Sequence, residues 1–440
     1  MIVSLLKIAA CMAGLIGLLV AVKSAGKRYA LGAEWQRKLL HVGLGLFSMS
    51  FPFIFQRAWE VLILCAASAG VMLSIRFLPG LRRSVGGSLY DVNRSSLGEL
   101  LFAVSIALLF WLSKDEPVTY VIPMLILTLS DAAAAIVGVH YGRHTYRIAQ
   151  GMKSWQGTAA FTVVTFGLSV SLLAWLTDLP VLHVVIIAAV LAWLGALIEA
   201  VSWYGVDNVV VPVGLYLLLD RLLTTQPAML ASILLVLLGL TGLGVVTARR
   251  ARLNVHALLS GIILAFCFWI IGGLPWLYPL LVVFFTHVVM AKRHPESETF
   301  DIRAILSLML TALPWLLLYR VYQNDSGYYL LLLSLAVHWQ INFLLSLRAL
   351  RGRPAEMSLL FGASLIATLA LLSMQPLIDG VTARNMLLLV AGFTILFLGG
   401  LLFRVSADRL SRERWIEQSL FSLSGSVIGI FPLLLSMRLT

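Results

Sequence analysis

Residues 118–143 read VTYVIPMLILTLSDAAAAIVGVHYGR, an apolar run of membrane-spanning length that contains one acid, Asp131. A carboxylate deep in a bilayer costs about 2.5–3.5 kcal/mol on insertion scales, so such residues usually serve a function. Small residues follow the acid, and Gly138 and Gly142 precede Arg143. We therefore predict a membrane helix that places an acid and a glycine-spaced turn at one face of the membrane.

A second polar stretch, KSWQGT, follows at residues 153–158. Glycines allow a backbone to approach a phosphate closely, and Mg²⁺ prefers hard oxygen ligands while keeping water and phosphate as its other ligands. We expect Asp131 to bind Mg²⁺ and Lys153 to neutralise a phosphate. Ser154, Gly157 and Thr158 would form a phosphate-facing turn at a helix start, without the spacing of a P-loop. The alternative for Asp131 is an ion pair with an arginine that locks two helices together.

Composition excludes a soluble domain of this length. The chain has 440 residues, is 60% hydrophobic and 12% charged, and has a mean hydropathy of +0.96. We predict an all-α, polytopic bundle of membrane helices. The net charge of +12 would suit a nucleic-acid-binding protein, but the basic residues lie between the apolar runs, as in loops beside anionic lipid. We expect no nucleic-acid partner. The three cysteines lie inside apolar runs and predict neither disulfides nor a metal site.

The chain has about sixteen apolar segments that we interpret as membrane segments. Segment 209–220 is too short for an upright crossing, and it either crosses the membrane or is re-entrant. Alternating loops place 25 of the 32 lysines and arginines on one side. The positive-inside rule makes that side cytoplasmic and puts both termini outside. We expect a prokaryotic cytoplasmic (inner) membrane, with the active site facing the cytoplasm. The segments are 2–22, 39–55, 59–75, 97–112, 118–138, 158–176, 181–199, 209–220, 228–247, 254–271, 275–290, 303–319, 328–347, 356–374, 385–403 and 416–436.

The chain divides into two predicted domains, 1–225 and 226–440. The sequences TTQP at 224–227 and RRAR at 249–252 interrupt the apolar pattern, and polar residues become sparse beyond about residue 228. The chemistry is therefore expected in the first domain.

Two further polar groups lie at the predicted cytoplasmic ends of segments in that domain. Lys38 and His41 are one helical turn apart and would bind a phosphate or position a substrate hydroxyl; the alternative is a basic anchor with a histidine buried in the bundle. Glu99, near Arg94, would bind a metal ion or orient that arginine. Its alternative role is a helix N-terminal carboxylate favoured by the helix dipole.

With the stretches around Asp131 and Lys153 counted as one group, a fourth group contains Glu199, Asp207 and Asn208. The two acids flank a short loop and would supply a second metal contact or a base. Alternatively, Asp207 caps a helix and Glu199 pairs with a loop arginine. All four groups share one predicted face, which favours a common site over four unrelated structural features.

These motifs resemble the polyprenol kinase family, which includes phytol kinase and dolichol kinase and is related to the CDP-diacylglycerol synthases. The resemblance covers about residues 30–220. Its carriers are Arg37-Lys38-x-x-His41, Asp131-x-x-Ala134-x-x-x-Gly138-x-x-x-Gly142-Arg143, Lys153-Ser154-x-x-Gly157-Thr158 and Glu199 with Asp207-Asn208 and Pro212. Members transfer the γ-phosphoryl group of a nucleoside triphosphate, typically CTP, to the hydroxyl of an isoprenoid alcohol.

The resemblance implies roles for individual residues. Asp131 would be the metal-binding catalytic acid, and Lys153 with Ser154 would belong to the nucleotide site. Glu199, Asp207 and Asn208 would complete the metal or base shell, and His41 and Lys38 carry over as well. The motif residues Gly138, Gly142, Arg143, Gly157 and Thr158 belong to the predicted nucleotide site as well. From the residues alone, and not from the resemblance, we add Arg94 to the nucleotide site and Glu99 to the metal ligands.

Residues 253–320 resemble, weakly, a second membrane family that includes phytyl-phosphate kinase. The carriers are LSG at 259–261, the glycine pair 272–273, Trp276, and Asp301 with Arg303. The later acidic, glycine-rich motif of that family is not found in 328–440. We expect the second domain to be a scaffold, a partner surface or a lipid-handling module.

The sequence thus predicts an integral membrane kinase that uses Mg²⁺ and CTP, or another nucleoside triphosphate, to phosphorylate an isoprenoid alcohol taken from the bilayer. Two alternatives stay open: a phosphatidate cytidylyltransferase and a non-enzymatic lipid transporter or flippase. Paired aspartates typical of the former are not found, and transporters usually concentrate polar groups at mid-membrane. The alcohol, the nucleotide and the oligomeric state are left undetermined.

Overall fold

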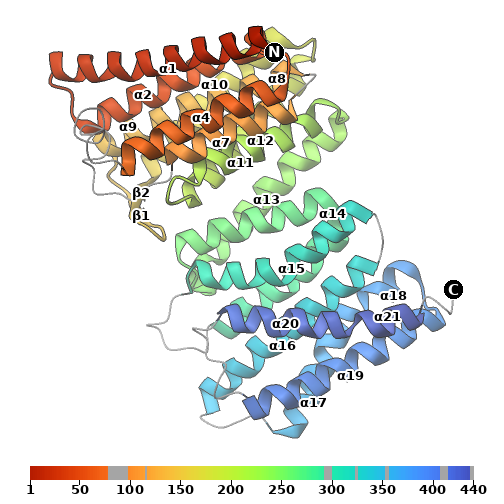
Figure 1. Ribbon diagram of the computed structural model, residues 1–440. Coiled ribbons are helices and arrows are strands. Elements are labelled where there is room, and N and C mark those ends of the chain that lie inside the picture. The colour runs from red at the N-terminus through yellow and green to blue at the C-terminus, as the bar shows by residue number, and fades with distance from the viewer. Residues whose placement is uncertain are drawn as a thin grey trace. The chain divides into compact units, whose positions relative to one another are not determined.

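The computed structural model describes residues 1–77, 98–113, 116–291, 300–322, 326–351, 356–406 and 415–436. The described part is almost entirely helical, which confirms the predicted all-α bundle (Figure 1). The chain forms two compact units, unit 1 (Met1–Leu237) and unit 2 (Leu238–Thr440), and the boundary lies within helix α13 (Pro227–Ala251).

Unit 1 contains apolar helices and one short β-hairpin. In the hairpin, antiparallel strands β1 and β2 pair Tyr146 with Lys153. The elements before α13 are α1 (Ile2–Arg28), α2 (Ala33–Ser48), α3 (Phe51–Ile54), α4 (Ala58–Phe77), α7 (Gly98–Leu112), α8 (Pro117–Leu125), the π-helical turn η2 (Ile126–Ser130), α9 (Asp131–Tyr141), β1 (Thr145–Arg147), β2 (Met152–Ser154), α10 (Trp155–Leu176), α11 (Val181–Val201) and α12 (Asp207–Leu223).

Unit 2 is built around α16. In the most apolar 18-residue stretch of this helix, 89% of the residues are buried. The long helix α14 is two helices joined at Gly273, whose φ of 73° is readily adopted only by glycine. The described elements after α13 are α14 (Val255–Ala291), α15 (Ile302–Tyr322), α16 (Ser326–Arg351), α17 (Met357–Ala367), η3 (Thr368–Leu372), α18 (Met374–Asp379), α19 (Ala383–Ser406), α20 (Trp415–Ile428) and α21 (Ile430–Ser436).

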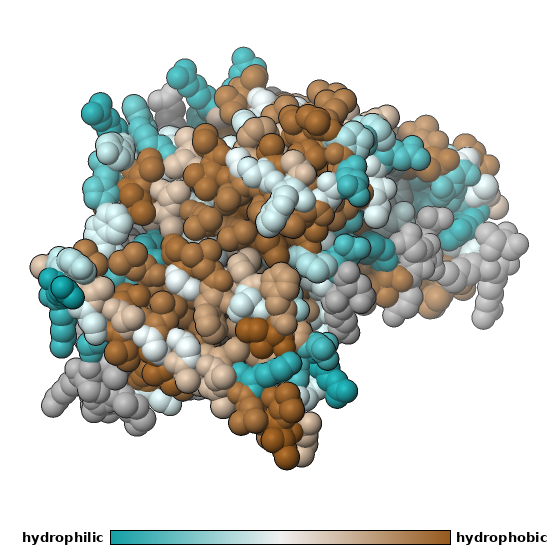
Figure 2. Space-filling view, turned by 90° about the horizontal axis from the view of Figure 1, so that it is seen from above, coloured by the Kyte–Doolittle hydropathy of each residue, from teal (hydrophilic) through white to brown (hydrophobic). Residues whose placement is uncertain are grey.

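The surface is that of an integral membrane protein. Figure 2 shows broad areas of apolar side chains, and residues such as Val163, Trp175 and Val246 are 70%, 81% and 78% exposed. Contiguous apolar surface of this extent is unusual on a protein surrounded by water. Within the described residues, twelve helices are long and apolar enough to cross a membrane.

Each of the sixteen predicted segments coincides with helical structure, and the kink in α14 separates segments 254–271 and 275–290. Segment 209–220 lies in α12, which has 17 residues, and α7 has 15. Helices this short are marginal for an upright crossing. The number of membrane crossings therefore stays a prediction.

Candidate active site

A polar cavity of about 400 Å³ lies in unit 1 where α2, α7, α9, the hairpin, α10, α11 and α12 meet. Most of the predicted site residues line it, although they are far apart in the sequence. Those that line it are Lys38, His41, Glu99, Asp131, Gly138, Lys153, Ser154, Gly157, Thr158, Glu199, Asp207 and Asn208. Gly142 and Arg143 do not line the cavity, and Arg143 is exposed. Arg94 lies outside the described residues.

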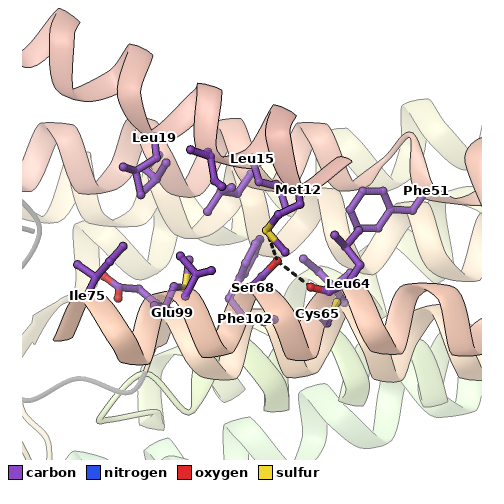
Figure 3. Close-up of a pocket in the computed structure, with 17 residues that line it drawn as sticks. Met12, Leu15, Leu19, Phe51, Leu64, Cys65, Ser68, Ile75, Glu99 and Phe102 are labelled. Atoms are coloured by element: carbon purple, nitrogen blue, oxygen red, sulfur yellow. Dashed lines mark hydrogen bonds between the residues drawn. The ribbon is translucent and has the colours of Figure 1, made fainter. Parts of the chain in front are cut away.

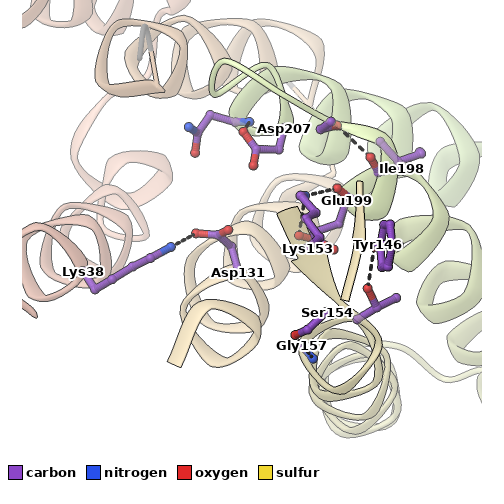
Figure 4. Close-up of polar contacts among 12 residues, drawn as sticks. Lys38, Asp131, Tyr146, Lys153, Ser154, Gly157, Ile198, Glu199 and Asp207 are labelled. Carbon is purple, nitrogen blue, oxygen red and sulfur yellow. Dashed lines mark hydrogen bonds and ion pairs between the residues drawn. The ribbon is translucent and has the colours of Figure 1, made fainter. Parts of the chain in front are cut away.

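Asp131 is held by two residues of α2. Lys38 Nζ donates to Asp131 Oδ2 at 2.6 Å, and His41 Nε2 lies 3.7 Å from the same oxygen (Figure 4). The ion pair joins α2 to α9, but its cation is a lysine and not the arginine of the alternative interpretation. Both side chains of the pair are largely buried, at 9% and 18% exposure.

The position of Asp131 follows from the irregular helix before it. Pro123 lies inside α8 and lacks an N–H group, and the chain continues through the π-helical turn Ile126–Ser130 directly into Asp131. π-Helical turns are rare in proteins and are frequently found at functional sites.

The contacts of His41 determine which of its ring nitrogens, Nε2, carries a proton. Its Nε2 lies 3.2 Å from the carbonyl oxygen of Leu127 and near Asp131 Oδ2, and both are acceptors. Nε2 must therefore carry a proton when these contacts form. At that atom His41 orients Asp131 and does not accept a proton.

Lys153 and Glu199 form the second ion pair. Strand β2 carries Lys153 toward the last turn of α11, where Nζ donates to Glu199 Oε1 at 2.6 Å and also to the backbone carbonyl of Glu199 (Figure 4). The other carboxylate oxygen, Oε2, is buried and has no hydrogen-bond partner among the described residues. A buried oxygen of this kind is costly unless a donor or a cation reaches it.

Asp207, the first residue of α12, is repelled by the carboxylates of Asp131 and Glu199. Desolvation of its half-buried carboxyl, followed by repulsion from Asp131 and Glu199, raises the pKa of Asp207 to about 6, against the opposing effect of Lys153. Asp207 Oδ1 accepts a hydrogen bond from the backbone N–H of Asn208 at 3.1 Å. The carboxylates of Asp131 and Glu199 therefore repel that of Asp207, and a cation near them would relieve this repulsion.

A complete metal site is not preformed. Among the described residues, no three acidic, histidine or cysteine side chains are grouped closely enough to hold an ion by themselves. The predicted ligands Asp131, Glu199, Asp207 and Glu99 thus do not form one tight cluster. Magnesium in phosphoryl-transfer sites usually takes one or two carboxylates and completes its shell with water and substrate phosphates. The unpartnered oxygen of Glu199 and the mutual repulsion of the acids fit such a partial site.

The glycines and Ser154 make contacts within the protein. Ser154 Oγ accepts from the N–H of Gly157 at 3.1 Å and so caps α10. A Cβ at Gly157 would lie 2.8 Å from the carbonyl oxygen of Ala134, so glycine allows α9 and α10 to approach closely. This packing brings the N-terminus of α10 to the cavity wall. The phosphate-facing role of this turn stays a prediction.

Two features of the site had only weak sequence signals. The β-hairpin falls in 139–157, which the sequence indicates as a loop; the alternation of buried Tyr146 and Ile148 with polar neighbours was the available signal. Tyr146 also donates or accepts a hydrogen bond with Thr158 at 3.0 Å, and burial raises the pKa of Tyr146. The second feature is the turn at Tyr204 and Gly205, with φ of 56° and 81°, which also lines the cavity.

Part of this chain is similar to a curated protein. The chain is 33% identical over 184 residues to a protein from Synechocystis sp. named phytol kinase, and the match covers 41% of this chain and 76% of the relative. The chain belongs to the phytol kinase family. This confirms the resemblance carried by the motifs. More than half of the chain lies outside this match. No family model matches the chain, and no solved structure matches it.

Proposed function

We propose that the protein is an integral membrane kinase that transfers the γ-phosphoryl group of CTP to the hydroxyl of an isoprenoid alcohol such as phytol, geranylgeraniol or dolichol. One observation carries the proposal: two lysine–carboxylate pairs and a third acid, from five separate elements, meet at one cavity in a bundle of apolar helices. Phosphoryl transfer depends on positioning and charge neutralisation, which such groups supply. The relative named phytol kinase supports the class of acceptor.

The two lysines have a defined part in this reaction. Lys38 and Lys153 neutralise carboxylates in the structure, and both line the cavity. When a triphosphate enters, its oxygens compete for these ammonium groups. Asp131 and Glu199 would hold Mg²⁺, which would neutralise negative charge on the phosphate oxygens, and the carboxylate of Asp207 would lie beside it.

The transfer step itself is a single displacement. The alcohol oxygen forms a bond to the γ-phosphorus while the bond from that phosphorus to the β–γ bridging oxygen breaks, which leaves CDP and the isoprenyl phosphate. The hydroxyl proton goes to a carboxylate of the cavity. Asp207 is our candidate because it makes no ion pair within the described part of the chain, whereas Asp131 and Glu199 are each paired with a lysine. His41 positions Asp131.

Site-directed variants test the assignment. Purified protein is assayed with radiolabelled CTP and a panel of isoprenoid alcohols, and Asp131→Asn and Lys153→Ala are each expected to lower turnover by at least about 100-fold. Asp178→Asn and Lys27→Ala are the matched controls, because both side chains are exposed and outside the cavity. Wild-type turnover in both folded site variants would contradict the assignment.

A further inference from the structure

A second, apolar cavity lies beside the polar one, between α1, α2, α4 and α7 (Figure 3). We call it the apolar groove. Its polar lining side chains include Ser68, whose hydroxyl already donates to the carbonyl oxygen of Leu64 at 2.8 Å. The residues that define it are Leu15 and Leu19 of α1, Cys65 and Met72 of α4, and Phe102 and Ile106 of α7.

The apolar groove is continuous with the polar cavity. Leu40, Leu44, Met72, Glu99 and Phe102 line both cavities. At this junction the ring centroids of Phe102 and His41 are 4.7 Å apart, and His41 lies beside Asp131. A molecule with its polar end among the charged groups therefore has an apolar path for its tail.

The groove has a buried end and an open side. Figure 3 places Ile75 and Glu99 toward one end and Phe51 and Leu64 toward the other. Phe51 and Leu64 are only 2% and 1% exposed, so that end of the groove lies inside the helix bundle. From Ile75 to Leu64 the groove follows α4 for about 16 Å, at the helical rise of 1.5 Å per residue.

The open side faces the surroundings of the helix bundle. Ile16 of α1 and Val71 of α4 line the groove and are 47% and 38% exposed. In a membrane this side gives lipid-soluble molecules access from the bilayer. Because bilayer lipid is as apolar as the groove, a bound chain gains little from the hydrophobic effect, and selection depends on how well the chain packs.

We propose that the apolar groove holds the chain of the isoprenoid alcohol, and that the buried end at Phe51 and Leu64 limits the chain length accepted. The proposal rests on the proposed function, because continuity with the phosphoryl-transfer cavity identifies the occupant. The hydroxyl lies at the junction near Glu99 and His41, and the chain lies along α4. An acyl chain of a membrane phospholipid is the competing occupant.

A pair of neighbouring substitutions tests the chain site. Ser68→Phe fills the middle of the groove, and Ala67→Phe places the same side chain on an exposed position of α4. We compare kcat/KM for geranylgeraniol with that for dimethylallyl alcohol, a single isoprene unit that needs no groove. Ser68→Phe is expected to lower the ratio at least tenfold, and Ala67→Phe to leave it within twofold. An unchanged ratio in Ser68→Phe, or equal loss for both alcohols, would overturn the proposal.

Photolabelling of the wild-type protein tests the site without turnover. A geranylgeraniol that carries a diazirine at its far end is expected to label peptides of α1, α4 or α7 that line the groove, and excess geranylgeraniol is expected to prevent the labelling. Labelling elsewhere, or displacement by excess phospholipid, would overturn the chain site. Groove labelling without phosphorylation of any alcohol would contradict the proposed function alone, whereas phosphorylation with labels elsewhere would contradict the groove alone.

Discussion

The two units bury different kinds of polar side chain. Unit 1 buries Lys38 and Glu199, which belong to ion pairs at the polar cavity. In the described part of unit 2, the buried polar side chains include no aspartate, glutamate, lysine or arginine. Its buried contacts are instead between uncharged groups, such as Ser419 with Ser307 and Gln340 with Ser364.

The buried charges of unit 1 indicate that the chemistry takes place there. Charges within a membrane protein are costly and usually mark a function, whereas hydroxyl and amide contacts hold helices together at modest energies. Among the described residues of 253–320, those that carry the weak resemblance to the phytyl-phosphate kinase family are not brought together in a charged site. Asp301 and Arg303 lie 3.7 Å apart and are about half exposed, and Gly273 forms the kink in α14. The expectation for unit 2 stays a scaffold, a partner surface or a lipid-handling module.

The largest expected effect comes from Glu199. Glu199→Gln removes the charge that pairs with Lys153 and is expected to lower kcat by at least about 100-fold, because a charged group of the transfer site is lost. The matched change in unit 2 is Gln340→Leu, which removes a buried polar contact and is expected to leave kcat within about twofold of wild type. A loss of kcat in Gln340→Leu as large as that in Glu199→Gln would break the comparison.

The pH dependence of metal binding sharpens the comparison between the two units. The pKa of Asp207 is raised to about 6, so its carboxyl is mostly ionised at pH 7 and mostly protonated at pH 5. Protons then compete with the metal, and Mg²⁺ affinity is expected to fall about tenfold over that interval. Titration calorimetry at several pH values measures this, and Asp207→Asn should remove most of the dependence. Equal affinity at pH 5 and pH 7 in the wild-type protein would contradict the electrostatic role of Asp207.

Sequence patterns predicted the helices well, because the apolar runs match membrane dimensions. They also predicted that residues as distant as Lys38, Asp131 and Asp207 share one site, from their common side and the family motifs. Which lysine pairs with which acid depends on helix rotation, which spacing alone does not determine. The phosphate-facing role of Gly157 stays a prediction. That Gly157 also lets α9 and α10 approach closely depends on helix packing, which spacing does not determine either.

Close helix packing gives the third prediction. Gly157→Ala places a methyl group 2.8 Å from the carbonyl oxygen of Ala134 and is expected to lower stability by about 1–3 kcal/mol. Activity should fall as well, because α9 carries Asp131 and α10 adjoins Lys153. Gly167→Ala is the control, since nothing lies near its would-be Cβ. Thermal unfolding in detergent measures the stability; equal melting temperatures for the two variants would contradict the packing role.

The smallest effect is expected for the hydroxyl contacts of unit 2. Ser419→Ala removes hydrogen bonds to Ser307 and should lower stability by about 0.6 kcal/mol, the mean for such contacts between membrane helices. Catalysis should not change. A lower kcat at unchanged stability would instead assign unit 2 a direct part in the reaction.

Position-specific labelling of CTP tests the central claim most directly. The purified protein is given phytol or geranylgeraniol with CTP that is radiolabelled at either its γ- or its α-phosphorus. Transfer by the charged cavity predicts that the γ-label enters an isoprenyl monophosphate, that the α-label stays in CDP, and that Asp131→Asn abolishes the transfer. Entry of the α-label into a lipid would instead indicate a cytidylyltransferase, and no labelled lipid from CTP or from any other γ-labelled nucleoside triphosphate would contradict a kinase.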